Sequence, residues 1–376
     1  MQKQQEHGII GGLVVKVIER CNLNCSYCYM YNHVDKSYLV RPRRMSDHTF
    51  DQLLQKLQQY RERHEGPATG ITFHGGEPTL LGHLLFEKFA SKARDLFGDK
   101  ILLCIQTNAT LVDDRWVELF RRYRVEVGVS CDGPPKINDA FRVDHRGRGS
   151  HTRMLEGLLR LKEGGVMRGV ICVINPAFDG LEVYEYFRSI GVDCMDFLIP
   201  DATHDTKESL YGKYGASPVA DYLIPIFDEW FEADDPRTKV RLFGNIIRVM
   251  LGGGSDSEAI GNPLQNYLVI ETDGTIHVTD ALKVCAEGVS DSGLNIFEHG
   301  FDDLHLGSPL LYTAVHEGFP LCNTCSLCPE RGVCGGGYLA HRYSRQNEFK
   351  NPSVWCRDLL MLISHIRGRI QVADAA

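Results

Sequence analysis

The sequence predicts an α/β protein, built as a partial (β/α)6 barrel that is followed by a cysteine-rich C-terminal region. Two observations support this prediction. Short apolar runs alternate with longer amphipathic runs through the first 200 residues, which is typical of parallel strands joined by helices. The thirteen cysteines are placed unevenly, with tight groups at 21–28 and 322–334. In a reducing compartment such groups indicate metal binding or catalysis rather than disulfides.

Six apolar runs are expected to form the strands, and five amphipathic runs between them the helices. The expected strands are Leu13–Ile18, Gly70–Phe73, Ile101–Gln106, Val125–Ser130, Gly169–Ile174 and Met195–Ile199. The expected helices are Ser46–His64, Leu84–Leu96, Asp113–Tyr123, His151–Lys162 and Leu181–Ser189. Ser46 is a typical helix cap. Six such units close part of a barrel, whose active-site groups lie at the carboxyl ends of the strands.

The remaining third of the chain follows a different pattern. Residues 200–260 are expected to be mostly helical, with a hinge or loop at 252–257. Asp273-Gly274 lies between two apolar runs and predicts a hairpin. A final helix is expected over Arg357–Val372. The expected domains are therefore a barrel at 9–215, a helical bridge at 216–262, and a cysteine-rich domain with the final helix at 263–376.

Bulk properties argue against a membrane protein and against a nucleic-acid-binding protein. No run approaches the roughly 18 apolar residues of a membrane span. The first residues lack the charged-then-apolar plan of a signal peptide. The net charge is −8 without an extended basic cluster, whereas proteins that grip phosphate backbones normally carry a basic patch. We therefore expect a cytoplasmic protein that partners neither nucleic acid nor membrane.

Three cysteines near the N-terminus have the spacing C-x3-C-x2-C, namely Cys21, Cys25 and Cys28. Three thiolates can hold three irons of a [4Fe–4S] cube and leave the fourth iron open to another ligand. A zinc site is the alternative, and it fits less well because a structural zinc site needs four ligands. The sequence therefore predicts a [4Fe–4S] cluster with an open iron site.

Polar and glycine residues follow the second, third and fourth expected strands. Two glycines let a backbone approach a ligand closely, and hydroxyl, amide and guanidinium groups can bind a ribose or a carboxylate. Taken singly, such residues are more often turn formers. The candidate residues are Gly75, Gly76, Glu77, Asn108, Ser130 and Arg142.

The cysteine triple, with Gly75-Gly76-Glu77-Pro78 about fifty residues later, resembles the radical S-adenosylmethionine (SAM) enzymes. The order of the polar residues is similar to the branch that includes the anaerobic sulfatase-maturating enzymes. The resemblance implies that the open iron chelates SAM and that the Gly-Gly-Glu segment takes its amino group. By the same resemblance, Asn108 and Ser130 touch the ribose or methionine end, Arg142 the methionine carboxylate, and Tyr27 lies near the adenine.

The C-terminal cysteines resemble a SPASM domain, which carries auxiliary iron–sulfur clusters. Cys325, Cys328, Cys334 and Cys356 match the outer auxiliary cluster of that family, and a zinc knuckle is the alternative. The inner auxiliary cluster departs from the sulfatase-maturase pattern, because Thr279 and Tyr338 stand where it has cysteines. The two cysteines left over are either ligands of a second, differently ligated cluster or spare thiols: Cys285 and Cys322. One or two auxiliary [4Fe–4S] clusters are therefore expected.

Asp280 aligns with the proton-accepting aspartate of sulfatase maturases, and an ordinary solvated turn is the alternative. The segments 279–285, 334–343 and 351–359 resemble the cyclophane-forming maturases of ribosomally made peptides. The resemblance implies a radical SAM oxidoreductase that joins an aromatic ring carbon to a β-carbon of a precursor peptide. It also implies an electron donor such as flavodoxin or ferredoxin.

Too few residues precede the first strand for a winged-helix leader-binding domain, so the precursor is expected to dock on the body of the enzyme or through a separate leader-binding protein. The alternatives are another peptide modification on the same scaffold (formylglycine, thioether or ether formation), an iron–sulfur redox sensor, or nucleic-acid modification, which the charge disfavours. The substrate peptide, the residues joined and the oligomeric state do not follow from the sequence.

Overall fold

The computed structural model describes residues 10–64 and 69–374, with side chains described as far as residue 371. Contacts between residues group the chain into two units. The first unit comprises Met1–Ser130, Phe141–Arg168 and Leu264–Gly318, and the second comprises Cys131–Ala140, Gly169–Pro263 and Phe319–Ala376. The domain boundaries at 9–215, 216–262 and 263–376 stay a prediction. Residue 9 and the N-terminal stretch considered for a signal peptide lie outside the described residues.

The strands of the first unit follow the order β10-β9-β8-β1-β2-β3-β4. Strands β8, β1, β2, β3 and β4 pair in parallel, whereas β9 and β10 pair antiparallel to their neighbours. The bounds are β1 Gly12–Ile18, β2 Thr69–Gly75, β3 Ile101–Thr107, β4 Val125–Ser130, β8 Tyr267–Ile270, β9 Thr275–His277 and β10 Asp291–Asn295. The first four strands were predicted to within two residues at each end.

The hairpin expected at Asp273-Gly274 joins β8 to β9. Gly274 has a φ of 86°, a left-handed conformation that favours glycine, and its N–H donates to the Glu271 carbonyl at 2.9 Å. The sequence did not reveal that β8 also pairs in parallel with β1, where Gly12 lies opposite Tyr267. This pairing places the residues that follow β9 beside the N-terminal strand.

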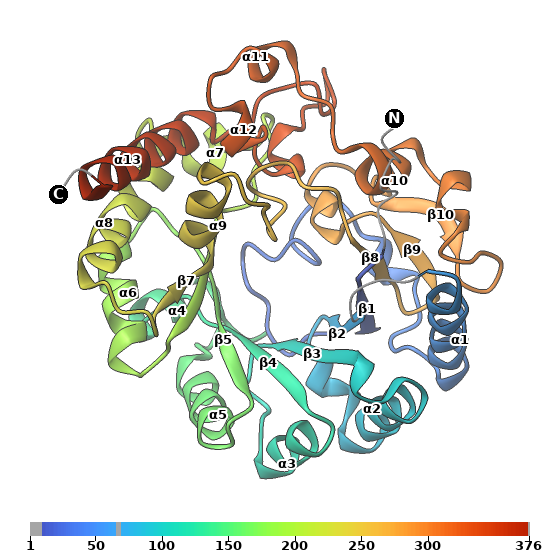
Figure 1. Cartoon of the computed structure of the whole chain (residues 1–376). Coiled ribbons are helices and arrows are strands. Elements are labelled where there is room, and N and C mark those ends of the chain that lie inside the picture. The colour runs from blue at the N-terminus through green and yellow to red at the C-terminus, as the bar shows by residue number, and fades with distance from the viewer. Residues whose placement is uncertain (1–9, 65–68, 375–376) are drawn as a thin grey trace. The chain divides into compact units, whose positions relative to one another are not determined.

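Helices cover the strands of the first unit from outside (Figure 1). Ser46 caps α1 as expected, accepting a hydrogen bond from the Thr49 N–H at 3.0 Å. Aromatic rings pack this helix against the sheet and against the next helix: Phe50 stacks on Phe73 of β2 with centroids 6.2 Å apart and on Phe89 of α2 with centroids 4.1 Å apart. The elements are α1 Asp47–Arg63, α2 His83–Phe97, α3 Asp114–Arg122, α5 His151–Glu163 and α10 Pro309–Tyr312, with 3-10 turns at Ser37–Leu39, Pro78–Leu81, Gly98–Lys100, Asp280–Val284 and Asp303–Leu306 and a π-helical turn at Thr313–Glu317.

The second unit contains parallel strands and several helices. Strands β5 (Met167–Val173, which begins in the first unit), β6 (Cys194–Leu198) and β7 (Lys239–Val240) lie side by side. Helix α8 contacts α6 and α13, and α9 contacts β6 and α12. The helices are α4 Pro135–Phe141, α6 Gly180–Ser189, α7 Lys207–Tyr211, α8 Pro218–Ala233, α9 Arg241–Met250, α11 Asn323–Ser326, α12 Arg331–Cys334 and α13 Cys356–Asp374, with 3-10 turns at Gly212–Tyr214 and Leu339–Arg342.

The predicted fold class is confirmed: the protein is α/β with parallel strands and a cysteine-rich C-terminal region. The helical character of residues 200–260 is also confirmed, with loop structure after α9. Among the residues that the structure describes, no helix is long and apolar enough to span a membrane.

A cluster of charged side chains lies inside the first unit. Glu19 and Glu271 are both 0 % exposed, and Lys283 donates to Glu271 Oε1 at 2.7 Å. Burial and the neighbouring Glu271 raise the pKa of Glu19 to about 8. Burial also acts to raise the pKa of Glu271, but the nearby His277 and Lys283 outweigh it and lower that pKa. The two carboxyl groups therefore carry one negative charge between them, and Lys283 neutralises it.

Replacing Lys283 tests this charge balance. The Lys283→Met substitution leaves a carboxylate buried without its cation, and we expect it to lower the free energy of unfolding by about 3–5 kcal/mol. Lys88→Met is the matched control, because Lys88 is 51 % exposed and pairs with Asp47 on the surface; its effect should stay within about 0.5 kcal/mol. Guanidinium unfolding midpoints measure both values, and equal midpoints for the two variants would contradict the assignment.

Candidate active site

The loop that follows β1 carries the three N-terminal cysteines. Its backbone turns back on itself, with the Cys28 N–H donating to the Cys25 carbonyl at 3.0 Å. Burial, together with the nearby Glu77 carboxylate and the thiols of Cys25 and Cys28, raises the pKa of Cys21 to about 12. The three sulfurs thus lie near one another in a partly buried place where thiolates are unfavourable without a cation. This donor set fits a metal cluster, whose positive charge deprotonates its thiol ligands.

The spacing of the thiols differs from that of a site for one metal ion. Within the described ranges 10–64 and 69–374, no three His, Cys, Asp or Glu side chains are close enough together to hold a single ion. The cysteine ligands of an iron–sulfur cube bind separate irons and therefore stand farther apart than the ligands of one ion.

The glycine pair after β2 presses against the start of the cysteine loop. Gly75 has a φ of 138°, and a Cβ there would overlap the Ile18 carbonyl. A Cβ on Gly76 would overlap both the Arg20 carbonyl and the Tyr31 hydroxyl. The Gly76 N–H also donates to the Ile18 carbonyl at 2.8 Å. The two glycines are therefore required for the chain to pass this close to the cysteine loop.

Glu77 ties the ends of β2 and β3 together. It is 1 % exposed, and its Oε1 accepts from the Thr79 N–H at 3.0 Å and from the Thr107 hydroxyl at 2.6 Å. Its Oε2 accepts from the Asn108 N–H at 2.7 Å. Burial raises the pKa of Glu77, and these hydrogen bonds oppose the shift. A carboxylate has about four acceptor positions, so Oε2 keeps one for a further donor.

Asn108 stands between the end of β3 and the first cysteine. Its Nδ2 donates to Asn22 Oδ1 at 2.9 Å and lies 3.8 Å from the Cys21 sulfur. Its Oδ1 accepts from the Thr110 N–H at 3.0 Å. Asn108 is therefore next to the cysteine loop, at the carboxyl end of a parallel strand, where the sequence placed it.

The other predicted SAM-pocket residues occur in two hydrogen-bonded pairs. Arg142 is 8 % exposed and donates to the Tyr27 hydroxyl at 2.7 Å. Gln106 donates to the Ser130 hydroxyl at 2.9 Å, which joins the ends of β3 and β4. The structure thus brings Tyr27 together with Arg142, although they are far apart in the sequence.

Asp280 is held by a group of polar residues at the end of β1 and β2. Lys16 is 0 % exposed, and its ammonium donates to Asp280, to Tyr29 Oη at 3.0 Å and to His74 Nδ1 at 3.0 Å. The Tyr29 hydroxyl also donates to Asp280 Oδ2 at 2.6 Å. The Asp280 side chain is 17 % exposed, so this group borders on solvent-accessible space. We call these four residues the Asp280 group.

The charges in the Asp280 group follow from its contacts. Burial opposes the shift, but the Lys16 ammonium lowers the pKa of Asp280, which therefore carries its negative charge. Burial and Lys16 lower the pKa of His74 to about 3, so its ring is neutral. Since His74 Nδ1 accepts from the Gly75 N–H as well as from Lys16, its proton lies on Nε2.

Lys16, Tyr29 and His74 were not candidates from the sequence. One signal for Lys16 was available, because a lysine in the middle of a buried apolar strand is rare unless it is paired. His74 and Tyr29 carried no such signal, since each only adjoins a motif, His74 before Gly75 and Tyr29 after Cys28.

Five cysteines gather in the second unit. Burial, together with the thiols of Cys322, Cys334 and Cys356, raises the pKa of Cys325 to about 12. Cys328 is close enough to Cys334 and Cys356 to act to raise the pKa of each. Cys322 is thus next to the four cysteines that match the outer auxiliary cluster. Cys285 lies in the first unit, 8 % exposed, directly after the turn Asp280–Val284.

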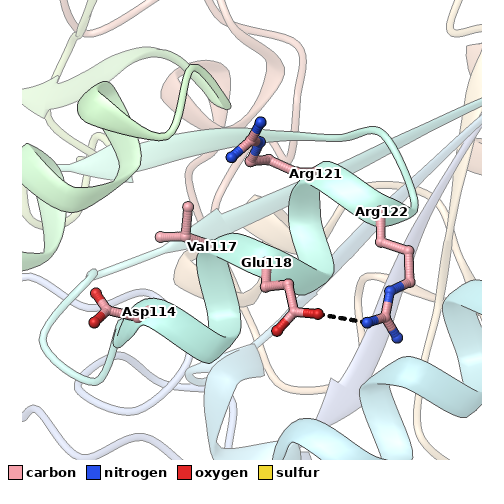
Figure 2. A pocket seen from close by; sticks show the side chains of 5 residues that line it. All are labelled: Asp114, Val117, Glu118, Arg121 and Arg122. Atoms are coloured by element: carbon pink, nitrogen blue, oxygen red, sulfur yellow. Dashed lines mark hydrogen bonds and ion pairs between the residues drawn. The ribbon is translucent and has the colours of Figure 1, made fainter.

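A separate surface pocket contains none of the predicted site residues. It lies on α3 and is lined by Asp114, Val117, Glu118, Arg121 and Arg122 (Figure 2). Glu118 and Arg122 form an ion pair one helical turn apart. This is an ordinary charged helix face, and nothing in it points to catalysis.

A protein-family model matches the part of the chain that contains most of these candidate residues. Residues 15–196, which contain the cysteine triple, Glu77, Asn108 and Arg142, match the model of the radical SAM superfamily. Residues 15–196 form a radical SAM domain. The resemblance stated from the sequence is thereby confirmed for this part of the chain.

Two curated relatives are sulfatase-maturating enzymes. The serine-type anaerobic sulfatase-maturating enzyme of Bacteroides thetaiotaomicron is 30 % identical over 280 residues, which cover 69 % of this chain and 66 % of that protein. The cysteine-type anaerobic sulfatase-maturating enzyme of Clostridium perfringens is 28 % identical over 360 residues, or 90 % of each chain.

Solved structures share the fold. Native anSMEcpe with bound AdoMet superimposes with a TM-score of 0.82 at 23 % identity, covering 97 % of this chain and 99 % of that one. Streptococcus suis SuiB bound to precursor peptide SuiA superimposes with a TM-score of 0.59 at 17 % identity, covering 93 % and 76 %. At these identities the likeness establishes the radical SAM fold.

Gly76→Ala tests the close approach of β2 to the cysteine loop. The added Cβ would displace the Arg20 carbonyl and Tyr31, and we expect the N-terminal site to lose most of its iron. Iron and sulfide per chain after anaerobic reconstitution measure this loss. Gly244→Ala is the matched control, since nothing lies within 4 Å of its added Cβ in α9. It should keep full iron and gain about 0.5–1 kcal/mol of stability, and equal iron in both variants would contradict the role of Gly76.

Proposed function

We propose that this chain is a peptide maturase that binds SAM at a [4Fe–4S] cluster held by Cys21, Cys25 and Cys28. In this proposal a 5′-deoxyadenosyl radical abstracts hydrogen from a residue of a precursor peptide. An intramolecular bond then forms between an aromatic ring carbon and a β-carbon, giving a cyclophane.

The proposal rests mainly on three parts of the chain that lie together at one edge of the sheet. The cysteine loop, the Gly75-Gly76-Glu77 segment and Asn108 lie in contact with one another. Glu77 Oε2 keeps an acceptor position that suits the amino group of SAM. Arg142, joined to Tyr27, supplies a cation for the methionine carboxylate.

Cross-link formation removes two hydrogens from the peptide, and each needs a destination. One leaves as a hydrogen atom and becomes part of 5′-deoxyadenosine. The other leaves as a proton and an electron as the new carbon–carbon bond forms. Asp280 is an ionised carboxylate that borders on accessible space and can accept the proton; because Lys16 lowers its pKa, it acts as a weak base.

The electron needs an acceptor outside the peptide. A cluster bound by Cys325, Cys328, Cys334 and Cys356 would supply a redox-active site, since four thiolates give a closed cluster. Cys322 and Cys285 are retained as candidate ligands of a second cluster. We further propose flavodoxin or ferredoxin as the electron donor and a separate leader-binding protein as a partner.

Formylglycine formation is the second candidate function. Relatives that cover most of this chain are sulfatase-maturating enzymes, and Asp280 suits that reaction equally well. The cyclophane is favoured because Thr279 and Tyr338 replace cysteines of the sulfatase-maturase pattern. Thr279 instead accepts a hydrogen bond from the Tyr267 hydroxyl at 3.1 Å.

Mass spectrometry of a matched precursor peptide separates the candidates. With dithionite and SAM under anaerobic conditions, we expect 5′-deoxyadenosine and a peptide that is two hydrogens lighter at an aromatic residue. An aldehyde at Ser or Cys would instead identify formylglycine formation. A chain that yields no 5′-deoxyadenosine would be a redox sensor and not an enzyme of this class.

Asp280→Asn tests the proton acceptor. The amide keeps the shape of the side chain but cannot accept the proton, so cross-linked product should fall about 10²–10⁴-fold. Formation of 5′-deoxyadenosine should continue, because hydrogen abstraction precedes the proton transfer. Asp273→Asn, in the hairpin that precedes Asp280, is the matched control, with its side chain 34 % exposed and unchanged product expected. Unchanged product from Asp280→Asn would exclude Asp280 as the acceptor.

A further inference from the structure

Arg342 is a buried cation in the second unit that no ion pair explains. It is 2 % exposed, and the structure shows no carboxylate within ion-pairing distance of it among the residues described. Its Nη1 is buried and has no hydrogen-bond partner. A buried charge is costly unless an opposite charge lies nearby, so Arg342 calls for an anion.

The rest of the guanidinium is fixed by the glycine run after Cys334. Its Nη2 donates to the carbonyls of Gly335 at 2.6 Å and Gly337 at 2.8 Å, and its Nε donates to the Gly336 carbonyl at 3.1 Å. The three glycines have φ values of 61°, 83° and 70°. Such a left-handed run is open to glycine, and it turns three successive carbonyls onto one guanidinium.

Cysteine thiols lie near Arg342, and they would be anionic as ligands of a cluster. Burial lowers the pKa of Arg342, and Cys325, Cys334 and Cys322 oppose that shift. Burial raises the pKa of the Cys334 thiol, and the charge of Arg342 opposes that rise. The guanidinium contacts the carbonyl of Gly335, the residue after Cys334, so it lies beside a cysteine that would hold the auxiliary cluster, and its Nη1 stays unpartnered.

We propose that Arg342 is the counter-charge of the auxiliary cluster and raises its reduction potential. A four-thiolate cluster is anionic and gains one more negative charge on reduction. A buried cation beside it stabilises the reduced form more than the oxidised form. This inference rests on the proposed four-cysteine cluster, and it assigns Arg342 the task of making that cluster a better acceptor for the electron released from the peptide.

The test measures the midpoint potential of the auxiliary cluster in the full chain. Cys21, Cys25, Cys28 and Cys285 are replaced by Ala, so that only the C-terminal cysteines can hold the cluster that the redox titration follows. In that background Arg342→Gln should lower the ratio of reduced to oxidised cluster about tenfold at a fixed potential, a shift of about 59 mV for one electron. Arg342→Lys keeps the charge and should stay close to the parent.

Arg331→Gln is the matched control. Arg331 lies in the same cysteine-rich segment but is exposed, and its Nη1 donates to the Ser326 carbonyl at 3.1 Å. Solvent screens its charge, so its removal should leave the midpoint unchanged. A purely structural Arg342 would predict loss of iron in both Arg342 variants and no shift of potential in the protein that keeps iron.

The outcomes separate this inference from the cluster assignment. Four irons with an unchanged midpoint in Arg342→Gln would contradict the role of Arg342 alone. If Arg342→Gln loses its iron, Arg342→Lys decides: retained iron at the parent potential supports the counter-charge, and lost iron contradicts it. A parent background without iron would contradict the cluster and this inference together.

Discussion

The close approach of the Gly75-Gly76 backbone to the cysteine loop is the constraint on which the candidate site depends. Side chains at these positions would overlap the carbonyls of Ile18 and Arg20, so β2 could not end where it does. Glu77 follows directly and fixes Asn108 through its N–H. The positions of the three thiols, the acidic side chain and the amide are thus set by one backbone contact, and the chemistry proposed for them follows from that contact.

Buried charge gives the first unit a second kind of constraint. Lys16 and Lys283 both lie inside it, and each is neutralised by a carboxylate from the segment 271–280. Lys16 also lowers the pKa of Glu271, so the two ion pairs influence each other. The charge on Asp280 is therefore a property of the whole network and not of one contact. A protein can keep such a network where a reaction needs a fixed charge at a dry site.

The sequence was sufficient for local features and insufficient for distant ones. The four N-terminal strands, the Ser46 cap and the hairpin at Asp273-Gly274 follow from periodicity and turn chemistry within short windows. Cys21, Glu77 and Asn108 could be placed together because parallel strands end at one edge. The pairing of β8 with β1 had no local signal, and neither did the contacts of Lys16, which join residues far apart in the chain. The sequence did not single out Arg342, because its distinguishing feature is a buried Nη1 without a hydrogen-bond partner, and a sequence does not show which groups are buried.

The parallel pairing of β8 with β1 also imposes an order on assembly. The thiols, Glu77 and Asn108 belong to the first 110 residues, which a ribosome releases early. The carboxylate that neutralises Lys16 is made much later, and closing so long a loop is slow. Until β8 docks, the ammonium of Lys16 has to remain hydrated, and the edge of β1 stays open. A nascent or truncated chain can thus carry every proposed ligand of the N-terminal cluster while its interior is still hydrated, so the first unit is complete only after the last third of the chain has folded onto it.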